Sequence, residues 1–214
     1  MKSNQLHFLI TAGGTREYVD PVRFISNASS GKMGYALADV AVKVGHKVTL
    51  ITTVKNPQFK IKNSKLKIVE VETVGQMFKA VKKHFSKCNC LIMAAAVADY
   101  TPVKKSKIKI KKSSKNLVIR LKPTVDILKW AGKNKKKNQI VVGFALEDKN
   151  LRRNAEKKLK DKNLDMIIAN NLIAVGSEKA AVQIKTTGSR WIKWPAANKK
   201  TVAAGIIYLV RNLY

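Results

Sequence analysis

Short apolar runs alternate with amphipathic stretches along most of the chain. The apolar runs predict buried strands at His7–Thr11, Lys47–Thr53, Leu66–Val71, Leu91–Ala96, Gln139–Ala145 and Asp165–Ala169. Apolar residues at helical spacing predict helices at Met33–Val44, Val74–Phe85, Leu151–Lys162 and Lys199–Asn212. Gly45 directly follows the first of these helices, where a glycine commonly ends a helix. Strands that alternate with helices predict an α/β fold, a doubly wound and mostly parallel sheet with helices on both faces.

One region departs from this alternation of strands and helices. Lysine alternates with isoleucine over Lys107–Lys112, and a second alternating stretch covers Asn116–Lys122. A period of two is typical of a strand whose two faces differ, and residues 113–115 would form a short turn. We therefore expect a β-hairpin flap that projects from a Rossmann-like sheet, with residues 1–214 as a single domain. The pattern assigns no place in the sheet to Ser177–Trp194.

The composition is that of a globular protein, with 45% hydrophobic and 7% aromatic residues. The longest apolar run, Cys90–Ala98, is far shorter than the ~20 residues that span a bilayer, so we expect no membrane association. Cys88 and Cys90 are too close in sequence for an ordinary disulfide and lack the spacing of a zinc site. Together with an N-terminus that lacks a signal-peptide pattern, they indicate a cytoplasmic protein.

The chain carries 43 Lys and Arg against 13 Asp and Glu, a net charge of +30. Nucleic-acid binding is the obvious non-enzymatic interpretation, because neutralising phosphates releases counterions. Few of the basic residues are arginine, the side chain favoured for bidentate phosphate and base contacts, and the lysines are spread along the chain. We therefore expect no nucleic-acid partner, although a small polyanionic ligand would benefit from the same field.

In an open α/β sheet, ligands bind at the carboxyl ends of the strands, so the loops that follow strands are the candidate sites. In the first such loop, Gly13 and Gly14 permit a close backbone approach. Residues 29–34 (SSGKMG) then open the first helix with hydroxyl groups, glycines and backbone N–H groups that could hold an anion. An ordinary capped helix with a glycine turn explains the same residues equally well.

Two familiar phosphate-binding motifs are absent from this loop. Met33 follows Lys32 where a Walker A motif requires Ser or Thr, and Ser26 stands where it requires glycine. A dinucleotide fingerprint requires G-x-G-x-x-G directly after the strand, which the chain does not have. A reductase that uses NADP, with Lys55 on the extra phosphate, remains an alternative enzyme class.

The loops after two later strands carry further candidates. Asp99 follows the apolar run and could help hold a metal–triphosphate or a substrate, or simply cap the turn before Thr101 and Pro102. Phe144 lies at the end of its strand, where an aromatic ring could cover a base or belong to the core.

The motifs ITAGGTREYVDPVRFISNASSGKMG, AAAVADYTPV, KIKK, VGFALED and KLKDKNLDMIIANN occur in this order. Together they resemble the phosphopantothenoylcysteine synthetase family, the second enzyme domain of the bifunctional bacterial coenzyme A biosynthesis flavoprotein. The resemblance extends from about His7 to the C-terminus. It implies a phosphopantothenate–cysteine ligase that joins 4′-phosphopantothenate to L-cysteine with Mg²⁺ and a nucleoside triphosphate, usually CTP. The implied reaction proceeds through an acyl-cytidylate and releases pyrophosphate and CMP.

The resemblance also implies roles for individual residues. Asn27 and Lys109, the first lysine of KIKK, match catalytic positions, and Asp99 matches a carboxylate on the nucleotide or metal side. The implied nucleotide-binding positions are Gly13, Ser30, Gly31, Gly34, Ala94, Asp99, Lys109, Val125, Asp126, Ile127, Leu128, Phe144, Lys158 and Lys162. The implied substrate-binding positions are Asn27, Ala95 and Ala96.

A homodimer is implied as well, because the KIKK strands of the family pair between protomers and carry the lysine on a mobile flap. The chain contains no flavin-binding decarboxylase domain, so we expect either a stand-alone ligase or part of a bifunctional chain with a phosphopantothenoylcysteine decarboxylase partner. The chain departs from the family at Val125, which replaces a usual proline, while Pro123 stands two residues upstream.

Overall fold

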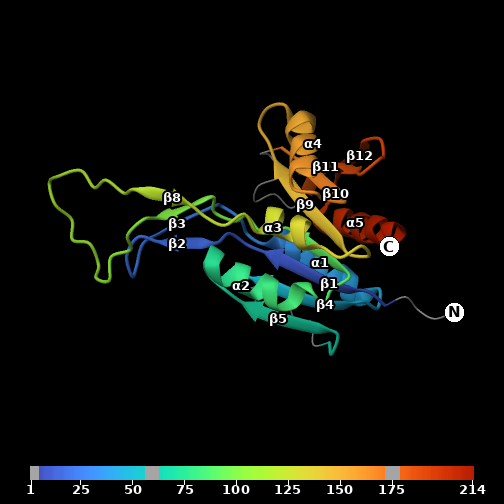
Figure 1. The fold of residues 1–214 in the computed structure, drawn as a ribbon, viewed down its shortest axis with the longest axis horizontal. Helices are drawn as coiled ribbons and strands as arrows, with labels where there is room; N and C mark the ends of the chain where they lie inside the picture. Colours follow the sequence, from blue (N-terminus) through green and yellow to red (C-terminus); the bar gives the residue numbers. More distant parts are fainter. Residues whose placement is uncertain (1–4, 56–62, 172–178) are drawn as a thin grey trace.

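The computed structural model describes residues 5–55, 63–171 and 179–214 (Figure 1). Its main sheet has eight strands in the order β12-β11-β10-β9-β6-β1-β4-β5. These strands are β1 (His7–Ala12), β4 (Lys47–Thr52), β5 (Leu66–Glu70), β6 (Cys90–Met93), β9 (Ile140–Leu146), β10 (Met166–Asn170), β11 (Lys179–Thr186) and β12 (Ile192–Asn198). The helices are α1 (Lys32–Lys43), α2 (Val74–Phe85), α3 (Ile127–Asn134), α4 (Leu151–Asp161) and α5 (Lys199–Leu213).

The strands from β5 across to β10 are parallel, and β11 and β12 extend one edge in antiparallel pairing. From β1 the chain builds the sheet outward through β4 and β5, then returns to place β6 on the other side of β1. The strand order therefore reverses between β1 and β6, which makes this the topological switch point where ligands bind in such sheets. The predicted doubly wound α/β fold is confirmed.

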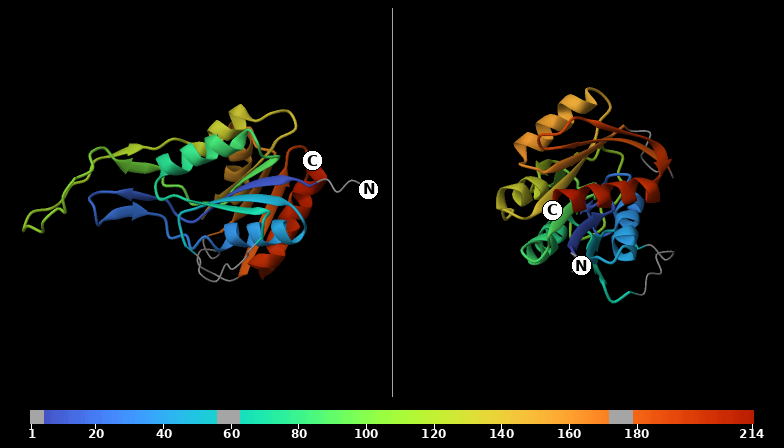
Figure 2. Two further views of the ribbon diagram at one scale, coloured as in Figure 1. Left: turned by 90° about the horizontal axis from the view of Figure 1, so that it is seen from below. Right: turned by 90° about the vertical axis from the view of Figure 1, so that its right-hand side faces the viewer.

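The helices cover both faces of the sheet (Figure 2). Helices α1 and α5 pack together on one face, and α2, α3 and α4 contribute to the apolar layer on the other. Because β1 is covered on both faces, Phe8 and Ile10 enter one layer while Leu9 enters the other. The continuous apolar runs in the sequence are therefore strands buried on both sides.

Local sequence signals fix the ends of the helices. Gly45, which follows the C-cap residue Val44 of α1, has a φ of 93°, as expected for a glycine that ends a helix. Thr73 and Gln76 form a capping box before α2: the Thr73 hydroxyl accepts from the Gln76 N–H, and the Gln76 side chain accepts from the Thr73 N–H. Helix α2 has the predicted bounds of Val74–Phe85.

The projecting hairpin is present, but its predicted strands are wrong. The antiparallel pairing lies at its base, between β7 (Tyr100–Pro102) and β8 (Leu121–Pro123), and neither Lys107–Lys112 nor Asn116–Arg120 forms a strand. We call residues 100–123 the arm, which extends well beyond the body (Figure 1). Ile108 is 76% exposed and Val118 is 83% exposed, so the part of the chain that the structure describes does not cover the apolar face that a ribbon would need.

The pattern also missed several elements. A short hairpin of β2 (Arg16–Tyr18) and β3 (Phe24–Ser26) lies beside the base of the arm, and α3 was not expected. The unassigned segment contains β11 and the start of β12, which form the antiparallel edge of the main sheet. Its first two residues, 177 and 178, lie outside the described residues.

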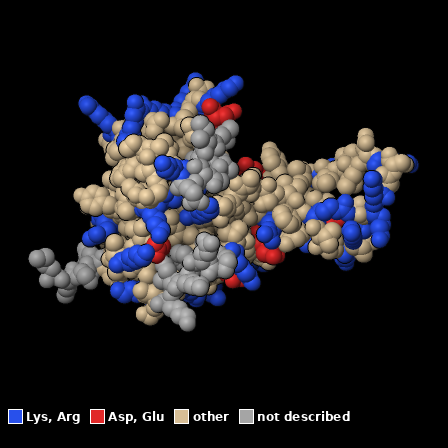
Figure 3. Space-filling model, turned by 180° about the vertical axis from the view of Figure 1, so that it is seen from behind, with Lys and Arg blue, Asp and Glu red and all other residues tan. Residues whose placement is uncertain are grey.

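The described residues include no helix with the length and apolar character needed to cross a membrane. Basic side chains are scattered over the face in Figure 3, on both the body and the projecting arm.

Candidate functional site

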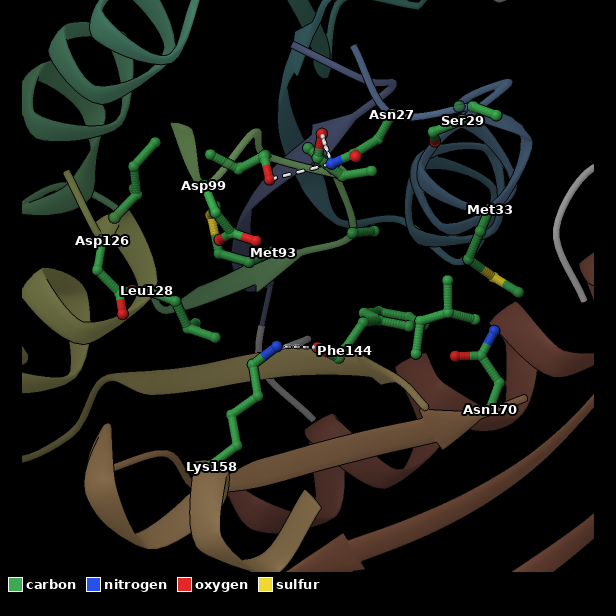
Figure 4. Close-up of a pocket in the computed structure, with 18 of the residues that line it drawn as sticks. Asn27, Ser29, Met33, Met93, Asp99, Asp126, Leu128, Phe144, Lys158 and Asn170 are labelled. Carbon is green, nitrogen blue, oxygen red and sulfur yellow. Dashed lines mark hydrogen bonds between the residues drawn. The ribbon is translucent and has the colours of Figure 1, made fainter. Parts of the chain in front are cut away.

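A cavity of about 840 Å³ lies at the switch point of the sheet. It is bordered by the loops after β1 and β6, the N-terminus of α1, the start of α3 and one side of α4 (Figure 4). The predicted site residues that line it are Asn27, Ser30, Gly31, Ala94, Ala95, Ala96, Asp99, Val125, Asp126, Ile127, Leu128, Phe144, Lys158 and Lys162. The lining does not include Gly13, Gly34 or Lys109.

The loops after β1 and β6 are joined by backbone hydrogen bonds beyond the ends of the two strands. The N–H of Ala96 donates to the Gly13 carbonyl at 2.9 Å, and the N–H of Thr15 donates to the Ala96 carbonyl at 3.2 Å. The buried hydroxyl of Thr15 also accepts from the N–H of Ala98 at 2.9 Å. Gly13 has a φ of 87°, a conformation that favours glycine. Gly13 therefore helps to hold the two loops that border the cavity together, although it does not itself line the cavity.

The N-terminus of α1 opens onto the cavity. Gly31 is the N-cap residue of α1, with a φ of 73° and no side-chain hydrogen bond to the helix. Gly31, Lys32 and Met33 all line the cavity. Backbone N–H groups in the first turn and the helix dipole make such an end suitable for an anion. Gly34 contributes by packing, because a Cβ there would lie 2.5 Å from the Cβ of Ala12. Its missing side chain lets α1 approach β1.

Asn27 reaches the cavity from the end of the β2–β3 hairpin. Its Nδ2 donates to the carbonyl oxygens of Val97 at 3.2 Å and Ala96 at 3.4 Å (Figure 4). This pairing uses the amide nitrogen, so a ligand would meet Asn27 through its amide oxygen, which can only accept hydrogen bonds.

The opposite side of the cavity is basic. Lys158 lies on α4, and its Nζ donates to the backbone carbonyl of Phe144 at 2.7 Å (Figure 4). Removal from water, together with the nearby charge of Lys162, lowers the pKa of Lys158, while Glu147, Asp126 and Asp99 oppose this shift.

Lys162 pairs with Asp126, with 2.7 Å between Nζ and Oδ2. The other oxygen of Asp126 accepts from the Lys129 N–H at 2.9 Å and caps the start of α3. Partial removal from water would raise the pKa of Asp126, but the contacts with Lys162 and the Lys129 N–H outweigh this and hold it below its usual range. Asp126 thus fixes both α3 and a cationic group at the cavity wall.

The carboxylates at the site bear on whether Mg²⁺ could bind there. Among the described residues no three His, Cys, Asp or Glu side chains cluster as metal ligands. A protein cage for a metal is therefore absent from that part of the chain. Mg²⁺ in nucleotide sites is often held by one or two carboxylates together with phosphate oxygens and water. The exposed carboxylate of Asp99 on the cavity wall fits this second kind of site.

Lys109 is the predicted catalytic residue that the fold leaves away from the cavity lining. It lies exposed on the arm, where residues 106 and 110 form hydrogen bonds with the turn of the β2–β3 hairpin. Within one chain, the structure therefore gathers the nucleotide-side candidates and Asn27 but does not bring Lys109 to them.

The model of the family described as DNA/pantothenate metabolism flavoprotein C-terminal domain (DFP) matches residues 3–213. The chain belongs to the DFP family. A solved C-terminal domain of the coenzyme A biosynthesis bifunctional protein CoaBC is 38% identical to this DFP chain, with a TM-score of 0.81. That comparison covers 97% of this chain and 95% of the solved one.

Curated relatives of this DFP chain carry two different names. A Cysteine/Cysteine sulfinic acid decarboxylase from an unknown prokaryotic organism is 42% identical over 98% of this chain and 59% of its own length. CoaBC of Borreliella burgdorferi is 44% identical over 94% of this chain and 51% of its own length. CoaBC of Bacillus subtilis is 46% identical over 80% of this chain and 41% of its own length. The chain thus spans about half the length of the curated relatives it matches.

The DFP cavity also has lining residues that the sequence interpretation missed. Asn170 ends β10 one residue beyond the predicted strand, and Met93 ends β6. Tyr100 and Lys199 contribute from the arm and from the first residue of α5. Asn170 could have been found from its position at the carboxyl end of a parallel strand, whereas Lys199 depends on how α5 returns to the sheet.

Proposed function

We propose that this DFP domain is a phosphopantothenate–cysteine ligase of coenzyme A biosynthesis, which uses CTP and forms an acyl-cytidylate. The observation that carries the proposal is that one cavity of about 840 Å³ at the switch point is lined by Asn27, Lys158, Lys162 and Asp99 together. The family membership and the names of the CoaBC relatives support it.

In the first proposed step, a carboxylate oxygen of 4′-phosphopantothenate attacks the α-phosphorus of CTP, and pyrophosphate leaves. The N–H groups at the start of α1 and the ammonium groups of Lys158 and Lys162 would hold the phosphates and stabilise developing charge. When bound, Mg²⁺ would neutralise phosphate charge, with Asp99 as its protein ligand. The ring of Phe144 lies on the same wall, where it could cover the base.

In the second proposed step, the amine of cysteine attacks the acyl carbon, CMP leaves, and the amine loses a proton as the amide forms. The amide oxygen of Asn27 would accept a hydrogen bond from that amine and direct it at the acyl carbon. The small side chains of Ala95 and Ala96 would leave room for the pantothenoyl chain. The ammonium group of Lys109 would place a positive charge next to the activated acyl group.

We further propose a homodimer in which Lys109 serves the cavity of the partner subunit. Lys109 does not line the cavity of its own chain. The arm and the neighbouring β2–β3 hairpin also expose large apolar side chains, at Val22, Phe24, Ile108, Leu117 and Val118. A second arm would cover these groups and provide the pairing that the alternating lysine and isoleucine pattern requires.

Other functions receive less support from the site. Lys55, the candidate for an NADP phosphate, pairs with Glu70 at 3.4 Å and does not line the cavity. The decarboxylase name belongs to a relative of which this chain matches 59%. Nucleic-acid binding rests on net charge alone.

The test is pyrophosphate release by the purified chain with 4′-phosphopantothenate, Mg²⁺ and either CTP or ATP, with and without cysteine. The proposal expects release that depends on phosphopantothenate and is faster with CTP, with an amide product only when cysteine is present. A folded protein that released no pyrophosphate with either nucleotide would contradict the ligase. Evolution of CO₂ from cysteine or cysteine sulfinate, or binding of NADP or DNA, would instead support one of the alternatives.

A further inference from the structure

Asp20 lies in the turn of the β2–β3 hairpin and takes no part in the cavity. Its side chain has 0% exposure because neighbouring groups cover it, although it lies in the projecting part of the molecule. Oδ1 accepts from the N–H groups of Val22 at 2.9 Å and Arg23 at 2.8 Å, which shapes the turn. Oδ2 reaches out of the turn, where it pairs with the Arg23 guanidinium at 2.9 Å.

The same carboxylate oxygen binds the arm. The backbone N–H of Ile110 donates to Oδ2 of Asp20 at 3.1 Å, and the Arg23 guanidinium donates to the carbonyl oxygen of Ile110. Both polar backbone groups of one arm residue are thus held by an ion pair in the hairpin turn. We call Asp20 and Arg23 the clamp. Burial alone would raise the pKa of Asp20, but the N–H groups of Val22, Ile110 and Arg23 and the Arg23 charge hold it below its usual range.

A second attachment lies a short distance before the clamp. The N–H of Ser106 donates to the carbonyl of Val19 at 2.9 Å. The Ser106 hydroxyl also donates to the carbonyl of Ile108 at 2.6 Å and closes a local turn. Lys109 therefore lies between two points at which the arm is fastened to the hairpin turn, and it is the residue next to the clamped Ile110.

The hairpin that carries the clamp also leads to Asn27. Arg23 directly precedes β3, and Asn27 directly follows it. Asn27 is in turn held against the loop after β6 through Ala96 and Val97. One short hairpin thus connects the fastened arm with the residue that faces the cavity.

We propose that Asp20, together with Arg23, is a positioning residue that clamps the backbone of Ile110 and so fixes the place of Lys109 on the arm. The effect on catalysis rests on the proposed ligase function, whereas the clamp itself can be tested without any activity. Asparagine cannot replace the carboxylate, because its NH₂ group would face either the Ile110 N–H or the N–H groups of the turn.

The test of the clamp is hydrogen exchange of the Ile110 amide, measured by NMR in the full-length wild-type protein and in Asp20→Asn. We expect exchange at least about tenfold faster in the variant, because a hydrogen bond to a charged acceptor is lost. Glu17→Gln is the matched control, because Glu17 is a buried carboxylate of the same hairpin whose Oε1 accepts from the Val74 N–H at 2.8 Å and not from Ile110. Unchanged exchange at Ile110 in Asp20→Asn would overturn the clamp. Should that variant fail to fold, Arg23→Met removes only the guanidinium of the clamp. We expect it to accelerate hydrogen exchange of the Ile110 amide as well.

The test of positioning is a double-mutant cycle on amide formation with Lys109→Gln. A clamp that acts through Lys109 predicts that Asp20→Asn lowers kcat in the wild-type background but adds no further loss to Lys109→Gln. Independent losses that multiply would overturn the positioning role even if the exchange result supports the clamp. A wild-type protein without ligase activity would sink the proposed function and leave the exchange experiment to decide the clamp alone.

Discussion

The ammonium group of Lys158 lies 2.7 Å from the backbone carbonyl oxygen of Phe144, so that α4 delivers a cation to the end of β9. The side chain is half-buried, and its pKa is lowered by removal from water and by Lys162. A cation held in place before ligand arrives is well suited to stabilise phosphate charge, because little reorganisation is then needed. The pair thus explains how a helix rich in solvated lysines can contribute to a site.

Replacing Lys158 tests this role. We expect Lys158→Met to lower kcat/KM for CTP in pyrophosphate release by roughly ten- to hundredfold, because a hydrogen-bonded charge is lost from the site. Lys157→Met is the matched control, because Lys157 lies on the same helix and pairs with Asp161 at the surface. Equal kinetics for the two variants would show that Lys158 has no part in nucleotide binding.

The hydrophobic pattern sufficed for the body of the fold because its strands are covered on both faces. The runs around Leu9 and Leu91 are apolar for that reason, whereas the switch point between their strands follows from the strand order in the structure. The edge strand β12 is largely exposed and contains Pro195, so it has no comparable signal. Strand β11 alternates buried and exposed residues, and this pattern could have revealed it.

The site was less predictable from local sequence. The roles of Lys158 and Asp126 depend on contacts with residues distant in the chain, which only the fold brings together. Motif resemblance nominated them, whereas the helix predicted for Leu151–Lys162 would by itself give Lys158 no role in a site. The strands of the arm were mispredicted because the alternation of lysine and isoleucine shows only that two faces differ. It does not show whether the same chain provides a surface that covers Ile108.

The close packing of Gly34 in α1 against β1 leads to a prediction about stability. We expect Gly34→Ala to lower the free energy of unfolding by about 1–3 kcal/mol, because its Cβ would lie 2.8 Å from the Thr11 carbonyl oxygen and closer still to Ala12. Gly75→Ala, in α2, is the control, since its Cβ would meet nothing nearer than 4.0 Å. We expect this control to stabilise the protein by about 0.5–1 kcal/mol. Urea unfolding monitored by circular dichroism would measure both, and a neutral Gly34→Ala would show that α1 can move away from β1.

His46 predicts a dependence of stability on pH. Its ring is buried, Nδ1 accepts from the Leu6 N–H at 3.2 Å, and Nε2 has no hydrogen-bond partner among the described residues. Burial first, and then the charges of Arg211 and Lys65, lower its pKa. The neutral ring therefore contributes stability that is present above the unfolded-state pKa of about 6.5 and is lost as the pH falls through the folded-state pKa.

Urea unfolding between pH 8 and pH 5, a range that spans the ordinary titration of histidine, would measure this dependence. We expect the wild-type free energy of unfolding to fall with acid, and we expect a shallower fall in His46→Asn. His84→Asn serves as the control, because His84 is only half-buried and its replacement should alter the slope less. An unchanged slope in His46→Asn would contradict the assignment.

The shared active site predicts complementation between two strongly impaired variants. In Asn27→Asp mixed with Lys109→Gln, each mixed dimer would contain one site with both wild-type residues. After subunit exchange we expect about a quarter of wild-type activity, because half of the dimers are mixed and each has one intact site. Absence of any recovered activity, with mixed dimers demonstrated by mass spectrometry, would mean that Lys109 acts within its own chain.

The most direct test of the central claim is to follow ¹⁸O from the carboxylate of labelled 4′-phosphopantothenate in a complete reaction with CTP, Mg²⁺ and cysteine. Attack of the carboxylate on the α-phosphorus, followed by cleavage of the acyl carbon–oxygen bond, transfers one labelled oxygen to CMP and leaves the other in the amide. We predict singly labelled CMP in an amount equal to the amide product. Unlabelled CMP, or label in inorganic phosphate, would contradict the acyl-cytidylate ligase.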